Sequence, residues 1–270
     1  MINIFEDLKE IGFEDFEKVD LYPAKADVSK SDGETKKARL TPAEVLYDKT
    51  YTCPVCGKVF KSKAIRSGKN RLINVDIDLK ANYDIVNPLI YECVVCENCG
   101  YSALAKSFNT LSSSQIRWIK EQICTRYKPQ KYPEYLTEKQ AVLRYKLTLL
   151  NAFVKKAKDG EKAYICLKLA WLYRDMKEKA LEDLFLQNAL TGFENAYNNE
   201  RFPIFELGEL TTAYIIATIY RNMGEYDKAM QWVGFVVMDR SVSLRLRTKG
   251  LHLKGIIAEE KKKKSEANVN

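Results

Sequence analysis

The chain has 270 residues, 46% of them hydrophobic and 30% charged, and its formal net charge is +8. These proportions are typical of a soluble globular protein with one large or two ordinary domains. No apolar run reaches the about 18 residues of a membrane span, and residues 1–10 lack the pattern of a secretory signal. We therefore expect a cytoplasmic protein with no membrane association. Its seven cysteines indicate metal binding and not a disulfide-stabilised secreted domain.

The first 44 residues divide into two parts. Residues 1–23 place Ile4, Leu8 and Ile11 at roughly helical spacing, which predicts an N-terminal amphipathic segment. We expect it to pack on its own domain, and docking on a partner is the alternative. Residues 24–44 contain almost no apolar side chains. Because such a stretch cannot offset its ordering entropy, we expect a mobile linker.

Two cysteine pairs define the next part of the chain, residues 45–109. Each has the form C-x2-C-G, and 39 residues (57 to 95) lie between them. A pair at this spacing lets two thiolates on a tight turn reach one metal ion, and the following glycine supplies the backbone freedom of the turn. Two such turns complete a tetrahedral four-sulfur shell. The sequence therefore predicts a small β zinc-ribbon module with one structural zinc ion (Zn2+) per chain. Its ligands are Cys53, Cys56, Cys96 and Cys99.

One further cysteine competes with this ligand set, because Cys93 precedes Cys96 by three positions. We prefer the pair that ends at Cys99, because a glycine follows it as in the first pair. Cys93 is then expected to be a buried thiol among the apolar residues of a strand. Cys124 and Cys166 fall in helical stretches, where we expect core cysteines.

Six basic residues and no acidic residue lie between positions 58 and 71. They are Lys58, Lys61, Lys63, Arg66, Lys69 and Arg71. With aromatic residues nearby, this combination is suited to binding a nucleic-acid backbone. The preferred interpretation is a solvated hairpin face, whose lysines also protect a sheet edge.

Residues 110–260 are expected to form helices. Ser112–Ser114 is an N-cap region, and Thr137 caps the next helix with Gln140 at the capping-box distance. Asp159–Gly160 is expected to end that helix. Its expected apolar face consists of Leu143, Leu147, Leu150 and Val154. Residues 261–270 begin with a lysine block and are expected to be a disordered tail.

Two stretches of this helical part resemble each other, with Ala170 and Ala217 at matching positions 47 residues apart. The second resembles a tetratricopeptide repeat with a turn glycine at Gly224, where the first has Lys177. Stacked helix pairs of this kind leave a concave face that can hold a peptide or another protein. Alternatively, the same residues pack against the zinc module. They are Trp171, Arg174, Tyr214, Thr218, Arg221 and Asn222.

The sequence contains no catalytic motif that we can identify. Its one histidine, His252, falls in the last expected helix. Asp76 and Asp78 share a strand face that we expect to be solvated. A zinc ion with four sulfur ligands has no open position and should not activate water. We therefore expect no enzymatic activity.

Short runs along nearly the whole chain carry a family resemblance in addition to the cysteine pairs. They are Asn3-Ile4-Phe5, Tyr47-Asp48-Lys49, Asn87-Pro88-Leu89, Cys99-Gly100-Tyr101, Lys168-Leu169-Ala170-Trp171-Leu172-Tyr173-Arg174 and Glu200-Arg201-Phe202-Pro203. In these runs the chain resembles a bacterial family, domain of unknown function 2225. The resemblance implies a zinc-ribbon-like front, a tetratricopeptide-like rear and no established activity. It also implies that Cys93 departs from the family pattern.

These observations predict an α+β protein in which a small β zinc-ribbon module precedes an α-helical tetratricopeptide-like repeat domain. The predicted function is a non-catalytic zinc-binding scaffold or adaptor that binds a protein partner through its helical surface. Nucleic-acid binding by the basic hairpin is the alternative. The sequence identifies neither the partner nor any self-association.

Overall fold

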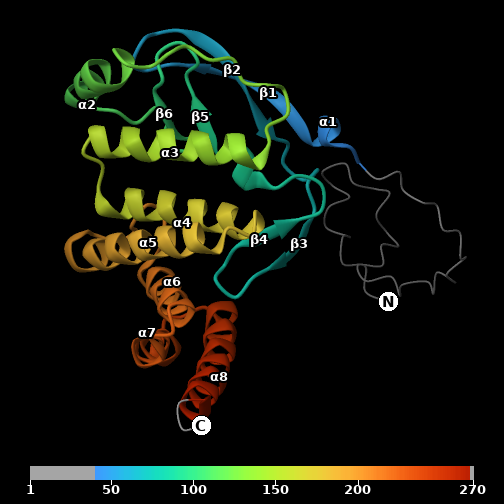
Figure 1. Cartoon of the computed structure of the whole chain (residues 1–270), viewed down its shortest axis with the longest axis vertical. Coiled ribbons are helices and arrows are strands. Elements are labelled where there is room, and N and C mark those ends of the chain that lie inside the picture. The colour runs from blue at the N-terminus through green and yellow to red at the C-terminus, as the bar shows by residue number, and fades with distance from the viewer. Residues whose placement is uncertain (1–39, 268–270) are drawn as a thin grey trace, which may run out of the picture. The chain divides into compact units, whose positions relative to one another are not determined.

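The structure, a computed structural model, describes residues 40–267, which belong to one compact unit, Leu40–Asn270. The expected amphipathic segment 1–23 and most of the expected linker 24–44 lie outside the described residues. Small antiparallel strand pairs come first and helices follow (Figure 1), which confirms the predicted α+β class.

Two of the strand pairs are built around the cysteine turns. After the short helix α1 (Pro42–Val45), β1 (Leu46–Thr52) pairs with β2 (Val59–Ile65), and the first C-x2-C-G turn joins them. In the same way β5 (Cys93–Val95) pairs with β6 (Ser102–Leu104) around the second turn. The chain therefore repeats one design, a hairpin whose turn carries two thiols.

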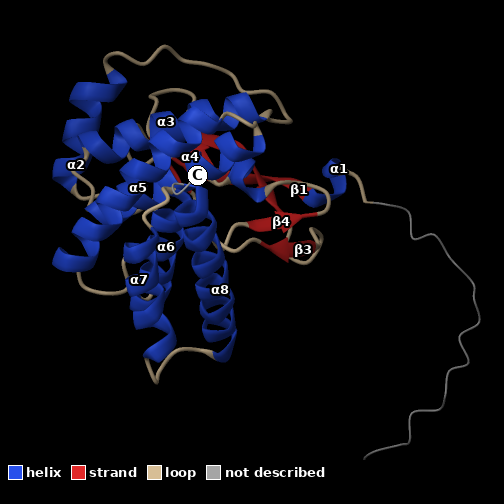
Figure 2. Ribbon diagram, turned by 60° about the horizontal axis from the view of Figure 1, so that its bottom comes forward, coloured by secondary structure: helices blue, strands red, loops and turns tan. Residues whose placement is uncertain are grey.

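A third hairpin, formed by β3 (Leu72–Val75) and β4 (Ala81–Tyr83), lies between these two in sequence. A 3-10 helix, η3 (Pro88–Tyr91), leads from it into β5. Figure 1 shows β3 and β4 beside the end of α4, and Figure 2 shows them next to β1. This third hairpin consequently contacts the helical part of the molecule, as described below.

The first helices begin at the residues that the sequence indicates. The hydroxyl of Ser112 caps α2 (Ser113–Ile119), which continues into a π-helix, η4 (Lys120–Cys124). Thr137 caps α3 (Glu138–Val154) with a complete capping box to Gln140, so both predicted caps are confirmed.

The expected end of α3 at Asp159–Gly160 is wrong, because these residues begin α4 (Asp159–Asp175). An acidic residue is favourable in a first helical turn, where the helix dipole is positive. A Cβ atom at Gly160 would come within 2.1 Å of the Ile204 side chain. This glycine therefore permits close packing inside a helix and does not end one.

Four further helices complete the fold: α5 (Lys179–Asn199), α6 (Glu209–Asn222), α7 (Tyr226–Met238) and α8 (Leu244–Ala267). The turns α4–α5 and α6–α7 have the same backbone geometry. Lys177 and Gly224 both take positive φ, 61° and 75°, and their N–H groups donate to Arg174 and Arg221 carbonyls at 3.0 and 2.9 Å. The two similar sequence stretches therefore form two similar helix pairs.

The last helix extends further than the sequence suggests. Residues 261–267 continue α8, whereas we expected a disordered tail from residue 261. Lys261 forms an ion pair with Asp227, and Arg221 Nε donates to Glu260 Oε2 at 2.9 Å. These contacts with the α6–α7 pair hold the end of α8, and they were not evident from the local lysine composition.

Buried apolar side chains form separate clusters. The largest runs from β5 and β6 through α3 and into α4–α8. A second cluster surrounds the two cysteine turns and includes Tyr101, Phe108 and Ile119. The cysteine turns thus have an apolar core of their own.

Candidate metal centre

The two cysteine turns have the same backbone geometry. In the first, Cys53 N–H donates to the Lys58 carbonyl and Gly57 N–H to the Cys53 carbonyl, both at 2.9 Å. The second repeats these bonds from Cys96 to Tyr101 and from Gly100 to Cys96, at 2.8 and 2.9 Å. Gly57 and Gly100 take φ values of 74° and 75°, a conformation that only glycine adopts without strain. Each turn therefore positions its two thiols by local hydrogen bonds.

The two turns face each other and bring four sulfur atoms together. All four Sγ atoms, those of Cys53, Cys56, Cys96 and Cys99, lie within 4.8 Å of one another. Cys53 and Cys99 Sγ are 3.6 Å apart, and Cys56 and Cys96 Sγ are 3.7 Å apart. A tetrahedral shell with metal–sulfur distances of about 2.3 Å has sulfur–sulfur edges of about 3.8 Å. The observed distances fit such a shell and are far too long for disulfides of about 2.05 Å.

The thiols of this group perturb one another electrostatically. The neighbouring thiols of Cys53 and Cys99 lower the pKa of Cys96 to about 2. The neighbouring Cys96 thiol raises the pKa of Cys53 to about 12, and the Cys53 thiol raises the pKa of Cys99. The protonation of these three thiols is therefore coupled. A divalent cation favours the thiolate form of all its sulfur ligands.

The remaining cysteines lie outside the four-sulfur group. Cys93 is fully buried in β5 within the largest core cluster, and burial raises the pKa of its thiol to about 12. Cys166 is buried in α4. Cys124 is only partly buried, at the end of η4, and burial raises the pKa of its thiol.

The residues expected on a concave helical surface contact the third hairpin instead. Trp171 Nε1 and Arg174 Nη1 both donate to Asp78 Oδ2, at 2.8 and 2.6 Å. Tyr214 Oη donates to the Ile77 carbonyl at 2.6 Å. These three side chains are therefore engaged within the chain and do not line an open face. These contacts correspond to the alternative expectation, packing against the predicted zinc module, because Ile77 and Asp78 lie within residues 45–109.

The other three members of that predicted set also differ from expectation. Thr218 is buried and donates to the carbonyl of Ile215 in its own helix. Arg221 is half-buried in its ion pair with Glu260 of α8. Asn222 is exposed at the end of α6. The six residues do not form one surface, because α6 buries the face that carries Tyr214 and Thr218.

Asp78 is the residue that the sequence interpretation placed wrongly. We expected it to share a solvated face with Asp76, but its exposed fraction is 3%. Asp76 is half-buried and accepts from Asn82 Nδ2 at 2.6 Å. His252 is exposed on α8. Alternation along a short strand could not reveal that one of two aspartates meets a distant tryptophan and arginine.

The six basic residues of the predicted nucleic-acid surface are divided between two ends of the β1–β2 hairpin. Lys58 and Lys61 lie near the first cysteine turn, whereas Arg66, Lys69 and Arg71 lie beyond the other end of β2. Lys63 forms ion pairs with Asp48 and Glu134 at 3.1 and 3.0 Å. Because Lys63 is neutralised and the other basic residues are divided, the six residues do not form one continuous basic surface. Nucleic-acid binding stays a prediction.

The exposed face of α3 also differs from expectation. Leu143 and Leu150, expected in its apolar core face, are 52% and 49% exposed. The helix instead buries a face that includes Tyr145, Thr148 and Asn151 against β5, β6 and the second turn. Val154 is buried as expected and Leu147 is half-buried, so only the part of the expected core stripe at Leu143 and Leu150 is exposed.

Within residues 40–267, no helix combines the length and apolar character needed to cross a membrane. Comparison with curated proteins and with solved structures gives no match. One family, described as uncharacterized proteins conserved in bacteria, matches residues 46–254, which include both cysteine turns and most of the helices. The chain therefore belongs to the bacterial family called domain of unknown function 2225.

Proposed function

We propose that this protein is a non-catalytic scaffold that binds one structural zinc ion and holds a protein partner on an apolar groove beside α3. The all-sulfur donor set supports zinc as the metal, because soft thiolates in a tetrahedral arrangement suit it. Four protein ligands leave the ion no open position for water or substrate. The metal's role in this proposal is to hold the two hairpins together.

The observation that carries the partner-binding part is the exposed apolar stripe of α3. Phe153 is 70% exposed, and Leu143 and Leu150 are about half exposed on the same helix. A groove of about 370 Å³ lies beside this stripe. Its lining consists of Gln122, Ile123, Arg126, Tyr127, Leu147, Leu150, Phe153 and Val154. We call it the α3 groove.

The chemistry of the α3 groove indicates the kind of partner. A contiguous apolar patch on an otherwise polar surface is a common mark of a protein interaction site. An amphipathic helix can fill such a groove with apolar side chains one turn apart. Arg126 is the one charged residue of the lining and is exposed at its edge. The partner segment is therefore expected to carry an acidic residue beside its apolar face.

Site-specific photo-crosslinking in the native host tests this proposal. A photoreactive phenylalanine analogue replaces Phe153 in the groove or, as a control, Leu184, which is 53% exposed on α5. We expect a discrete protein adduct from position 153 that Arg126→Glu weakens, and none from position 184. Failure to form an adduct at 153, or the same adducts from both positions, would contradict the proposal.

A further inference from the structure

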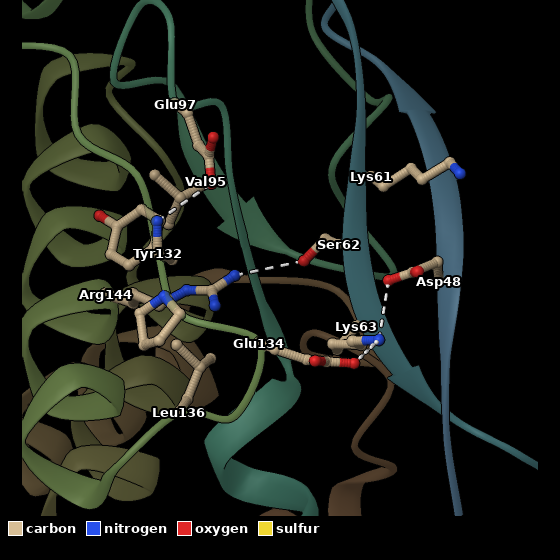
Figure 3. A pocket seen from close by; sticks show the side chains of 11 residues that line it. Asp48, Lys61, Ser62, Lys63, Val95, Glu97, Tyr132, Glu134, Leu136 and Arg144 are labelled. Atoms are coloured by element: carbon tan, nitrogen blue, oxygen red, sulfur yellow. Dashed lines mark hydrogen bonds and ion pairs between the residues drawn. The ribbon is translucent and has the colours of Figure 1, made fainter. Parts of the chain in front are cut away.

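A second cavity, unrelated to the α3 groove, contains a buried arginine. It has a volume of about 320 Å³ and lies between β2, β5, the loop before α3 and α3 itself. Figure 3 shows the guanidinium of Arg144 extending from α3 between Tyr132 and Ser62. The volume is at the lower end of the range of about 300–1,000 Å³ that is usual for small-molecule sites.

Arg144 has few hydrogen-bond partners for a buried cation. Its exposed fraction is 4%. Nη2 donates to the Cys93 carbonyl at 2.6 Å and to Ser62 Oγ at 3.4 Å. Nε is buried and has no hydrogen-bond partner among the residues that the structure describes. The Tyr132 ring lies 5.0 Å from the guanidinium carbon. These neighbours hold the guanidinium in place but supply no negative charge.

The other buried cations of the described chain show what is missing. Lys80, Lys155 and Lys168 are each buried and each forms an ion pair, with Asp175, Glu161 and Glu92 respectively. No carboxylate of residues 40–267 forms an ion pair with Arg144. Arginine remains charged in proteins, and an unpaired buried charge is strongly unfavourable. An anion from outside the chain would complete the environment of Arg144.

The charges around the cavity limit which anion fits. Asp48 and Glu134 share Lys63, and Glu97 accepts from Tyr132 N–H at 3.2 Å (Figure 3). With Lys61 and Arg144, the lining contains three cationic and three anionic side chains. Because these charges balance, the lining offers a nucleotide or another polyanion no net attraction. A zwitterion adds no net charge, and its ammonium group can approach those carboxylates.

We propose that this cavity binds a small zwitterionic carboxylate, of the amino-acid class, whose carboxylate pairs with the guanidinium of Arg144. Arginine is suited to this role, because its planar fork matches a carboxylate with two parallel hydrogen bonds. Ser62 Oγ, on β2, offers a hydroxyl at the same end of the cavity.

Titrations of the full, metal-loaded chain test the proposal through the NMR signal of the Arg144 Nε–H group. The probes are glycine, sodium acetate and sodium phosphate at constant ionic strength, with sodium chloride as the reference. We expect a saturable shift with glycine, a weaker one with acetate, and at least about tenfold weaker binding of phosphate. A shift that is absent, or equal for all four salts and ligands, would overturn the proposal. Tighter binding of phosphate than of glycine would overturn the assignment to a carboxylate.

Two substitutions provide the matched comparison. Arg144→Gln should abolish glycine binding measured by calorimetry, whereas Arg247→Gln, which removes a half-buried arginine of α8, should leave it unchanged. Ser62→Ala keeps the buried arginine and should weaken binding severalfold. If Arg144→Gln does not fold, the wild-type titration and the Ser62→Ala variant still test the site. No glycine-dependent shift of the Arg144 Nε–H signal in the wild-type protein would contradict it. An unchanged glycine affinity in Ser62→Ala would contradict it as well.

Discussion

The metal centre and the contact between the third hairpin and the helices are held together by interactions of very different sequence range. Each cysteine turn is closed by hydrogen bonds between residues at most five positions apart. The hairpin contact joins Asp78 to Trp171 and Ile77 to Tyr214, which are 93 and 137 positions apart. The first kind of structure follows from a local motif, whereas the second depends on how the whole chain packs. Four sets of substitutions probe this difference, and the sets are ordered by expected effect.

Loss of a cysteine ligand should have the largest effect. Cys53→Ser and Cys99→Ser each break the four-sulfur shell, and structural zinc sites contribute on the order of 10 kcal/mol to the folding of small modules. We expect about one zinc per wild-type chain by elemental analysis and almost none in either variant. Cys166→Ser, which changes a buried cysteine of α4, is the control and should retain the metal. Unchanged metal content in both ligand variants would exclude this ligand set.

Substitution of Asp78 should strongly destabilise the contact between the third hairpin and the helices. Asp78→Asn removes the charge that Arg174 and Trp171 share, and breaking one member of a buried ion pair costs about 3 kcal/mol. Urea denaturation should show this loss, and amide exchange should rise in β3 and β4. Asp76→Asn is the matched control, since Asp76 is only half-buried and forms no ion pair with any residue of 40–267. Equal stability of the two variants would show that the buried aspartate does not fix the hairpin.

The sequence predicts the parts of this protein that close locally. Cys53, Cys96 and their partner thiols follow from a four-residue spacing, and Ser112 and Thr137 follow from capping chemistry. Each turn and each cap has one dominant local solution, because its own interacting atoms lie within about one turn of chain. The repeated C-x2-C-G form then identifies two distant turns as halves of one group, in which Cys53 and Cys99 are 46 positions apart. The four-thiol group and the helix starts were therefore predictable from the sequence.

The sequence fails where a residue's partner lies far along the chain. Asp78 has the pattern of a solvated strand residue, and no sequence motif marks Arg144 as a buried arginine. Asp78 is buried where the β3–β4 hairpin contacts α4, and Arg144 is buried where the β1–β2 hairpin contacts α3. In both cases the contacting elements are distant in sequence. The prediction that the apolar stripe of α3 faces the core fails for a related reason. Periodicity shows that Leu143 and Leu150 share a face, but not which face the rest of the chain covers.

The two cysteine turns themselves differ in one respect that a glycine substitution can measure. Both glycines have positive φ, and an alanine there costs about 1 kcal/mol from the backbone alone. A Cβ at Gly57 meets no atom within 4 Å, whereas one at Gly100 comes within 2.4 Å of the Tyr127 ring. Gly57→Ala should cost about 1 kcal/mol and Gly100→Ala about 2–3 kcal/mol in thermal unfolding. Equal losses would mean that Tyr127 moves away at no cost.

The smallest effect is expected at the end of the helical part, where the tail joins α8. Arg221 and Glu260 are partly exposed, with side-chain exposures of 21% and 32%, and water screens much of their attraction. Such a pair contributes about 0.5–1 kcal/mol, which a double-mutant cycle of Arg221→Ala and Glu260→Ala can resolve. We expect the coupling to fall as salt concentration rises. A coupling of zero at low salt would indicate that apolar packing of Leu253 and Ile257 alone holds α8. Apolar burial would then stabilise the contact of α8 with the α6–α7 pair, whereas charge stabilises the contact of the third hairpin with α4 at Asp78.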